Sequence, residues 1–492
     1  MVERPKIVVI GAGMGGLAAA AVLSRRCDVT VIDKGQAAGG KVRQVSVGGA
    51  LIDSGPTVFT MDWAFRDVFA SAGAQLEDFV DMTPLDVLAR HAWPDAGRLD
   101  LFASVEESAE AIATFSGRRE ANNFRAFAKK SQEMFETLCG PFILAESPSM
   151  PALLSRRSPL SLLKTSPFST LWSALGKTFR DPRLQQLFGR YATYCGASPF
   201  SAPATLMLIA HVEQAGVWAL KGGMQAIAEA LEAVGRKNGA AYRFEETVDE
   251  VEVSGGRVSG VRLSGGERVP ADRIVFNGDV AALASGALGS DARRAATLPE
   301  GIQRSQSAIT WSGLATASGM DFDMHNVFFS EDYAAEFDAV FEQDRPPADP
   351  TVYICAQDCA PGTERSAPHR VLCLTNAPAN GDRHTYSEKE IEQCQDRMLR
   401  QVRRCGVDLT FQGSPEVTTP NQFNAMFPAT GGGLYGMASH GWAASFQRPG
   451  VRSKIQGLYL AGGSVHPGPG APMAALSGLA AARAAMADFG ST

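Results

Sequence analysis

The chain has 492 residues, of which 45% are hydrophobic and 20% are charged. Its 46 basic and 52 acidic residues give a formal net charge of −6, which argues against a general nucleic-acid binder because such proteins need basic residues to contact phosphates. The apolar content excludes a disordered chain, and the length predicts several structural units around a large core. The sequence contains no run of roughly 18 apolar residues, so we expect no membrane-spanning helix.

The eight cysteines are scattered along the chain, and only Cys355 and Cys359 lie close together. No histidine pair at zinc-binding spacing accompanies them, which favours reduced cysteines in the cytoplasm over a metal site or a disulfide framework. The sequence begins with a short charged stretch followed directly by an apolar segment, and we expect no signal peptide. These features predict a cytoplasmic protein that binds no metal.

The amino terminus carries the clearest chemical signal. Residues 6–10 (KIVVI) predict a short buried strand, and the GAGMGG that follows places Gly11, Gly13 and Gly16 in a G-x-G-x-x-G pattern before an alanine-rich helix. A second predicted strand ends next to Asp33. The glycines allow a tight turn, the approach of a pyrophosphate and helix–strand packing, and the acid accepts a hydrogen bond from a ribose hydroxyl. This order of elements predicts a dinucleotide-binding domain.

A second glycine motif follows. Gly39 and Gly40 precede Lys41, and after a short alternating stretch comes GALIDSGP, which ends in Gly55 and Pro56. The arrangement resembles the extended fingerprint of the glutathione-reductase and amine-oxidase class of flavoproteins, in which arginine usually follows the glycine pair near the FAD pyrophosphate. Lysine keeps the charge but lacks the planar fork of arginine. The resemblance implies FAD as cofactor, whereas the residues alone also fit a plain turn followed by a strand pair.

The far end of the chain predicts the second half of the same site. A short strand, residues 457–461, runs into a loop that contains Gly462 and Gly463, and an alanine-rich helix begins near Pro472 and Met473. The amino terminus of such a helix offers backbone N–H groups and a positive dipole to an electron-rich flavin edge. A terminal helix that only packs on the sheet is the structural alternative.

The middle of the chain predicts a helix over residues 222–237 and then a strand meander with Gly-Gly turns. The predicted strands span residues 239–244, 248–253, 257–263 and 268–276. This part resembles the segment of these flavoproteins in which Val248 would cover the adenine end of FAD.

The predicted fold class is α/β, with a discontinuous Rossmann-type FAD-binding domain of the glutathione-reductase and amine-oxidase kind. We expect residues 1–75, 205–290 and 440–492 to form that domain. Residues 76–204 and 291–439 are expected to form a discontinuous α+β substrate domain with a helical, membrane-facing portion.

Several longer segments resemble the bacterial phytoene-desaturase family of carotenoid desaturases, along most of the chain. They include DPRLQQLFGRYATYCGASPF (181–200), GVWALKGGMQAIAEAL (216–231), FPATGGGLYG (427–436) and GLYLAGGSVHPGPGAPMAALSG (457–478). Within the family, GGK in place of GGR and the wording of the last segment are most similar to the branch that acts on 1-hydroxylated acyclic carotenoids, the 1-hydroxycarotenoid 3,4-desaturases (hydroxyneurosporene desaturases).

The resemblance implies the removal of two hydrogens from adjacent saturated carbons of a lipophilic acyclic carotenoid during carotenoid biosynthesis, with hydride transfer to flavin N5. No catalytic base is identified from the sequence. Glu213, His325 and His440 lie in or beside the matched segments, but a structural role is the simpler interpretation of each. An allylic cation is stabilised by the polyene itself, so the reaction needs no strong base. Oxygen and a quinone both fit as the final electron acceptor.

Three other functions compete with this hypothesis. Phytoene desaturase, which performs several desaturation steps, is the nearest. A flavin amine oxidase on the same fold would need an aromatic cage and a lysine near the flavin, and the sequence indicates no such pair. A non-redox carotenoid isomerase or carrier would bind polyenes and leave the number of double bonds unchanged.

Residues 147–180 predict contact with a membrane. The segment holds five basic and no acidic residues, among leucines, phenylalanines and Trp172. Such a composition suits an anionic lipid surface, and a substrate of tens of carbons must enter the protein without crossing water. The alternative is a helical subdomain whose charges are simply solvated. We therefore expect peripheral, monotopic attachment to the cytoplasmic membrane, with Arg156, Arg157 and Lys164 among the contacting cations.

Overall fold

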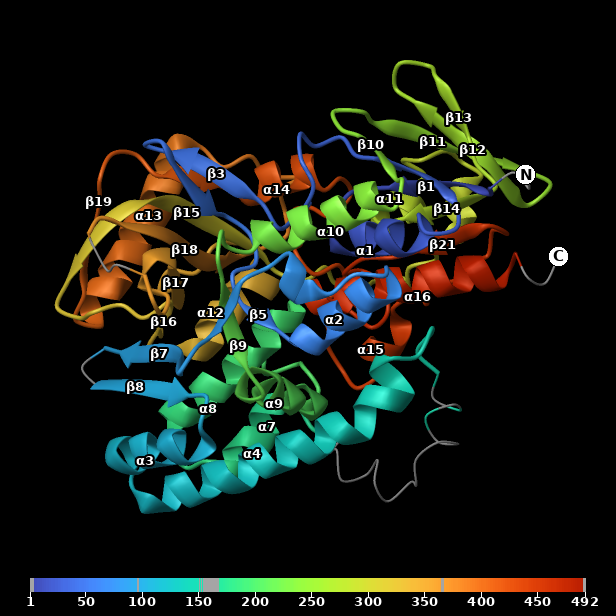
Figure 1. Cartoon of the computed structure of the whole chain (residues 1–492). Helices are drawn as coiled ribbons and strands as arrows, with labels where there is room; N and C mark the ends of the chain where they lie inside the picture. Colours follow the sequence, from blue (N-terminus) through green and yellow to red (C-terminus); the bar gives the residue numbers. More distant parts are fainter. Residues whose placement is uncertain are drawn as a thin grey trace.

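The computed structural model describes residues 4–94, 97–149, 151, 153, 168–363 and 367–489. Five parallel strands from distant parts of the chain form one sheet in the order β10-β2-β1-β14-β21 (Figure 1). They are β1 (Lys6–Ile10), β2 (Asp28–Ile32), β10 (Ala241–Arg243), β14 (Arg273–Phe276) and β21 (Leu458–Leu460). β1 and β14 are almost wholly buried, as expected of parallel strands covered on both faces.

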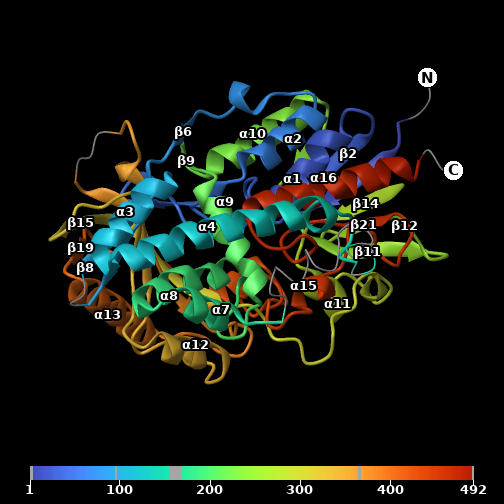
Figure 2. The ribbon, with the colours of Figure 1, turned by 90° about the horizontal axis from the view of Figure 1, so that it is seen from below.

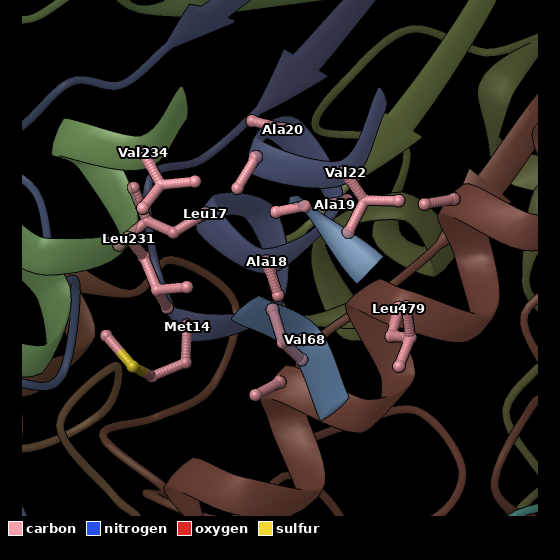
Figure 3. Packing of buried hydrophobic residues seen from close by; sticks show 14 of the residues in the cluster. Met14, Leu17, Ala18, Ala19, Ala20, Val22, Val68, Leu231, Val234 and Leu479 are labelled. Atoms are coloured by element: carbon pink, nitrogen blue, oxygen red, sulfur yellow. The ribbon is translucent and has the colours of Figure 1, made fainter. Parts of the chain in front are cut away.

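Helices α1 (Met14–Leu23) and α16 (Ala471–Ala487) pack on one face of this sheet, and α2 (Asp62–Ser71) and α10 (Gln225–Lys237) pack against α1. All ten residues of α1 are buried, and Figure 3 shows its Leu17 beside Leu231 of α10 and its Val22 on the side facing α16. Small residues on both helices allow α1 and α16 to approach closely: a Cβ on Gly478 of α16 would lie 2.0 Å from the carbonyl oxygen of Gly15 in α1. The alanine-rich segments therefore act as close-packing surfaces.

An antiparallel meander covers the other face of the parallel sheet. It consists of β11 (Val248–Ser254), β12 (Arg257–Leu263) and β13 (Arg268–Pro270), and α11 (Val280–Ser285) follows β14. Val251 and Val261 of the meander share an apolar cluster with Val8 of β1. The strand expected over residues 268–276 is divided in two, because Pro270 ends the ladder and Asp272 hydrogen-bonds the backbone of Lys6, so that β14 enters the parallel sheet.

A second large sheet lies on the substrate side, in the order β19-β15-β18-β17-β16-β7-β8, with β20 also paired to β15 (Figure 1). Its strands are β7 (Val87–Trp93), β8 (Gly97–Phe102), β15 (Ser307–Ser318), β16 (His325–Phe328), β17 (Val352–Ala356), β18 (His369–Ala377), β19 (Asp408–Phe411) and β20 (Glu416–Thr418). Helix α13 (Glu388–Arg404) packs Met398 and Val402 into the same core as Trp311 of β15. Helix α12 (Tyr333–Phe341) also lies on this side of the molecule.

Helices and short strands complete the substrate side. The helices are α3 (Val105–Ser116), α4 (Arg118–Leu138), α7 (Leu171–Thr178), α8 (Pro182–Gly189), α9 (Leu208–Gln214), α14 (Pro420–Met426) and α15 (Ala444–Gln447). Figure 2 shows this side from below, with α4 crossing the molecule and α7 and α8 beside it. The short strands are β3 (Gln44–Val47), β4 (Ala50–Asp53), β5 (Phe59–Thr60), β6 (Met82–Pro84) and β9 (Val217–Leu220). Stacked rings of Phe124, Phe127 and Phe188 hold α4 against α8.

The described residues contain no helix long and apolar enough to cross a membrane. They also contain no disulfide and no cluster of residues arranged to hold a metal ion. Much of the basic segment predicted to contact lipid, including Arg156, Arg157 and Lys164, lies outside the described residues. The part of it that is described forms α7 and the turn that leads to α8.

Candidate functional site

A cavity of about 1120 Å³ begins at the carboxyl edge of the parallel sheet and extends toward the substrate-side sheet. The final residues of three neighbouring strands, Ile10 of β1, Ile32 of β2 and Phe276 of β14, line it. This edge is where open parallel sheets bind their ligands. Residues of β15, β17 and β18 line the other side, so one continuous space joins the two halves of the molecule.

The predicted cofactor residues converge on this cavity from three distant segments. Those that line it are Gly11, Gly13, Asp33, Gly39, Gly40, Lys41, Gly55, Pro56, Val248, Gly462, Gly463, Pro472 and Met473. Gly16 does not line it and serves packing instead, because a Cβ there would lie 1.9 Å from the carbonyl oxygen of Gly11. The structure thus brings together residues that the sequence separates by hundreds of positions.

The half-buried carboxylate of Asp33 lies at the end of β2. One oxygen accepts from the backbone N–H of Ala12 and the other from that of Gly35, each at 2.6 Å. A carboxylate has roughly four lone-pair sites, so acceptor capacity is left for ribose hydroxyls. Glu246 to Asp249, a stretch that includes Val248, line the adjoining part of the cavity. This end of the cavity fits a nucleoside.

The two glycine motifs pack against each other, backbone to backbone, at the amino terminus of α1. Gly13 pairs with Gly39, and a Cβ on Gly40 would lie 3.1 Å from the Cα of Gly13. Gly11 has a φ of 99°, which favours glycine, and its carbonyl accepts from Asn277 Nδ2 at 3.2 Å. With no side chains on this surface, backbone N–H groups of the helix terminus are open to a pyrophosphate.

Asn277 was not identified from the sequence. It follows β14 directly, and its amide lies 2.8 Å from where a Cβ on Gly13 would be, so it closes the turn from behind. Its position just after an apolar strand was the available signal, because the carboxyl ends of parallel strands meet at one edge.

The amino terminus of α16 faces the cavity from the other end of the chain. Gly470 precedes the helix, and Ala471, Pro472 and Met473 of its first turn line the cavity. The positive end of the helix dipole therefore points into the site, where it can stabilise negative charge on a reduced flavin. The proline lies within the first turn, as the sequence predicted.

Two cations lie near this end, the half-buried Lys41 and the buried Arg448. Lys41 Nζ donates to the carbonyl of Leu434 at 2.6 Å, and burial lowers the pKa of Lys41, opposed by Asp279. Arg448, which the sequence analysis did not identify, donates to the carbonyl oxygens of Tyr435 and Gly463 at 3.1 Å. Burial likewise lowers the Arg448 pKa. Lys41 is thus engaged by the loop at residues 430–436, and both cations contribute positive charge to the cavity region.

The rest of the cavity is mostly apolar. Aliphatic and aromatic side chains of several elements line it, among them Leu138, Ile143, Leu206, Ile209, Val212, Leu372, Leu374 and Phe446. Phe168 and Trp442 also line it, yet they are 74% and 52% exposed, and their rings lie 5.8 Å apart. They therefore mark an opening to the surface. This part of the cavity fits a long apolar molecule.

Of the three residues weighed as bases, only Glu213 lines the cavity. Its carboxylate accepts from the hydroxyls of Tyr191 and Tyr194 at 2.6 and 2.5 Å. His325 is bonded to Tyr353, and burial lowers its pKa to about 3. His440 accepts from Ser198 N–H and is bonded to Gln303, and burial lowers its pKa to about 4. Each of the three is engaged within the protein.

Comparisons with known proteins agree with this geometry. The chain matches the family of flavin containing amine oxidoreductases over residues 14–486. It is 51% identical to a hydroxyneurosporene desaturase of Rubrivivax gelatinosus, covering 99% of this chain and 94% of that protein. It is 41% identical to a hydroxyneurosporene desaturase of Cereibacter sphaeroides, covering 99% and 98%. A solved putrescine oxidase variant shares the fold, with a TM-score of 0.61 at 13% identity and 99% coverage of both chains.

A dinucleotide cradle built from three chain segments, open to an apolar cavity, defines an FAD-dependent oxidoreductase. The chain belongs to the flavin containing amine oxidoreductase family and, within it, to the carotenoid desaturase branch.

Proposed function

We propose that the protein is an FAD-dependent desaturase that introduces the 3,4 double bond into a 1-hydroxylated acyclic carotenoid during carotenoid biosynthesis. The observation that carries the proposal is the continuity of the dinucleotide cradle with a long apolar space that opens at Phe168 and Trp442. The similarity to hydroxyneurosporene desaturases supports the substrate class. The sequence segments that resemble the 3,4-desaturase branch support the position of the new bond.

The residues present fit FAD. Asp33 and the stretch around Val248 would hold the adenosine, the glycines before α1 the pyrophosphate, and the first turn of α16 the ring end. When bound, FAD supplies a hydride acceptor, and the protein supplies orientation and electrostatics. Arg448 and the positive end of α16 favour negative charge at that end of the site.

The walls of the cavity would orient the polyene and exclude water. Apolar side chains surround the space, so a rod-like hydrocarbon gains burial along its whole length. Glu213 is held by two tyrosine hydroxyls, so the proposal assigns it no role as a base. A cation on a conjugated chain is delocalised, and its neighbouring proton can leave without a strong base.

The proposal includes attachment to the cytoplasmic membrane surface. The exposed rings of Phe168 and Trp442 lie at the cavity opening, and Leu144 is 50% exposed. Aromatic rings of this kind partition to the boundary between lipid headgroups and acyl chains. A carotenoid dissolved in lipid would then enter the cavity without crossing water. The basic residues of segment 147–180 would add attraction to anionic lipids.

An anaerobic assay tests the function. Purified FAD-loaded protein is mixed with liposomes that contain either a 1-hydroxylated acyclic carotenoid or phytoene, flavin bleaching is followed, and products are identified by mass and absorption. Loss of two hydrogens from the hydroxylated substrate alone is expected. Turnover of phytoene alone would assign the protein to phytoene desaturation, and isomerised product with no bleaching would indicate a non-redox isomerase. A further sample receives putrescine and no carotenoid, and bleaching in that sample alone would indicate an amine oxidase.

The same sample identifies the electron acceptor. After anaerobic bleaching, either oxygen or a soluble quinone is added, and the return of the oxidised flavin band is timed. The faster of the two reoxidation reactions identifies the acceptor to be used in steady-state assays.

A further inference from the structure

The apolar cavity contains a polar patch with a buried ion pair, which consists of Thr57, Arg190, Tyr194, Glu213 and Tyr353. Arg190 and Tyr194 belong to the 3₁₀ helix η3 (Arg190–Cys195), while Glu213 comes from α9 and Tyr353 from β17. Arg190 is 6% exposed and Glu213 is 4% exposed. A charged group at this depth must be stabilised by specific partners, and the identity of those partners indicates what the patch can bind.

The partners of Arg190 satisfy only part of its guanidinium. Nη1 donates to the hydroxyl of Tyr194 at 2.8 Å, and that hydroxyl donates to Glu213 at 2.5 Å. Nη2 lies 3.7 Å from Glu213, which is an ion pair but too long for a hydrogen bond. Although burial opposes it, the field of Tyr194 and Glu213 raises the pKa of Arg190, so the guanidinium stays charged.

Two nitrogen atoms of Arg190 are left to donate to a ligand. Among the described residues, neither Nε nor Nη2 has a hydrogen-bond acceptor, although both are buried. Buried donors without acceptors are rare and unfavourable in native proteins, and they indicate a bound group that the protein itself does not supply. Because Arg190 lines the cavity, a molecule in the cavity can supply the missing oxygen.

The patch lies beside the predicted cofactor residues. Thr57 follows Pro56, and its Oγ1 lies 2.7 Å from the hydroxyl of Tyr353, which is bonded in turn to His325 Nδ1 at 2.7 Å. Burial raises the pKa of Tyr353 and the charge of Arg190 opposes that shift, whereas burial lowers the pKa of His325 and the charge of Arg190 adds to it. Arg190 therefore lies close enough to act electrostatically on the Tyr353–His325 pair. The polar groups therefore line the same cavity as the predicted cofactor residues, and Thr57 adjoins those residues in the chain.

We infer that the polar patch binds the 1-hydroxyl of the substrate, with Arg190 donating to the hydroxyl oxygen. The inference rests on the proposed function and identifies the residues that select substrates with a 1-hydroxyl group. In a 1-hydroxylated carotenoid the oxygen is only a few bonds from C3 and C4, so the group that holds it must lie near the cofactor. Thr57 meets this requirement because it follows the predicted cofactor residue Pro56 directly and is hydrogen-bonded to Tyr353. Holding the hydroxyl selects which carbon–carbon bond is presented for hydride removal.

The same geometry predicts rejection of hydrocarbons. A carotenoid with hydrogen in place of the hydroxyl would fill the cavity and leave the Arg190 donors unpaired. Sites built to hydrogen-bond a hydroxyl reject analogues without one by about 10⁴- to 10⁵-fold, and we expect a preference of at least roughly 100-fold here.

The test compares a hydroxylated carotenoid with the same polyene lacking the hydroxyl. Both kcat/KM and the dissociation constant, from quenching of tryptophan fluorescence, are measured for the wild type and for an Arg190→Met, Glu213→Gln double variant. Replacing both members avoids leaving a buried carboxylate without its cation. We expect the preference for the hydroxylated over the non-hydroxylated carotenoid to fall at least about tenfold in the double variant, both in kcat/KM and in the dissociation constant. Only the values for the hydroxylated carotenoid should change, and the FAD content should stay the same.

A second pair of variants keeps the inference falsifiable if the double variant does not fold. Tyr353→Phe removes one hydroxyl of the patch and should reduce the preference about threefold to tenfold. Tyr386→Phe removes a buried hydroxyl that does not line the cavity, and should leave the preference unchanged. An unaltered preference in the double variant would overturn the inference, and so would an unaltered preference in Tyr353→Phe if the double variant does not fold. If the wild-type protein neither desaturates the substrate nor shows flavin bleaching, the proposed function is overturned. Even then, a preference for the hydroxylated carotenoid in wild-type binding that is lost in the variants would support the role of the patch.

Discussion

The carboxylate of Asp33 accepts a hydrogen bond from the backbone N–H of Ala12 at 2.6 Å, which joins the end of β2 to the glycine turn after β1. The bond to Gly35 N–H holds the other oxygen at 2.6 Å. The acid is therefore oriented by the protein itself, and its remaining lone pairs are free to accept further hydrogen bonds.

Replacing Asp33 with alanine should weaken FAD binding roughly 10- to 100-fold, because a hydrogen bond to a charged group contributes about 1.5–3 kcal/mol. Titration of the apoprotein with FAD, followed by flavin fluorescence, measures the change. Asp28→Ala is the matched control, because Asp28 is exposed at the opposite end of the same strand. Unchanged affinity in Asp33→Ala would exclude the ribose role.

Gly16 should tolerate no side chain. A Cβ there would lie 1.9 Å from the carbonyl oxygen of Gly11, a backbone atom that cannot move without shifting the turn. We expect Gly16→Ala to lower the free energy of unfolding by about 1–3 kcal/mol and to reduce FAD occupancy. Thermal denaturation and the flavin-to-protein ratio check both effects. Gly265→Ala, at a position with no neighbouring atoms within 4 Å, should match the wild type, and equal loss in both variants would refute this packing argument.

The stability of the fold should fall on acidification partly through His91. This side chain is fully buried, and burial, aided by the charge of Arg190, lowers its pKa from 6.5 to about 3. Between these two values the unfolded chain binds a proton that the folded chain does not. The contribution of His91 to the free energy of unfolding is therefore fully present above pH 6.5. It decreases as the pH falls toward about 3, by at most about 1.4 kcal/mol per pH unit.

A His91→Phe variant tests that pH dependence. The ring of His91 stacks near Trp93 and Phe329, so phenylalanine keeps the aromatic packing and removes the titrating group. When the pH is lowered from about 7 to about 5, the free energy of unfolding measured with urea should fall by roughly 2 kcal/mol less in the variant than in the wild type. Equal losses in the two proteins would contradict the prediction.

Attachment to lipid should depend on the two rings at the cavity opening. Changing Phe168 and Trp442 to serine removes apolar area that lipid would bury, and should weaken sedimentation with anionic liposomes roughly tenfold or more. Leu51→Ser is the control, because Leu51 is 56% exposed and does not line the cavity. If the ring variant and the control sediment alike, the opening does not contact the membrane.

The charges of segment 147–180 give a separate prediction. Replacing Arg156, Arg157 and Lys164 with glutamate should abolish sedimentation with anionic liposomes, since each cation near such a surface contributes about 1 kcal/mol. Raising the salt concentration should weaken wild-type attachment in the same direction. Attachment that persists in the variant would place the contact elsewhere.

The nucleotide half of the site was predictable because its chemistry is carried by short local patterns. A turn that needs glycine at Gly11 and a strand that ends beside Asp33 are properties of neighbouring residues, and their spacing is visible in the sequence. The first turn of α16 was predictable for the same reason, from Pro472 before an alanine-rich helix. Arg448 was missed because a single polar residue has no local pattern, and its role arises from contacts with distant backbone. Asn277 had one local signal, its position directly after an apolar strand, but its contact with Gly11 is also long-range.

The polar patch shows the same limit more clearly. Glu213 was singled out as a conceivable base, yet its partners Tyr194 and Arg190 approach it from a different helix, and Tyr353 comes from a strand far along the chain. The positions of such groups depend on how helices and sheets pack, and sequence spacing carries no information about that packing.

By itself the sequence determined the cofactor class, the parallel sheet and the family, because glycine conformation, strand hydrophobicity and helix termini are local properties that a motif records. Only the tertiary structure decided that three segments meet at one cavity, that Lys41 is engaged by Leu434 393 residues away, and that a partly unsatisfied Arg190 lies in an apolar space. Those features are sums of long-range contacts, and the burial that makes an unpaired donor or a buried charge significant exists only once the chain has folded.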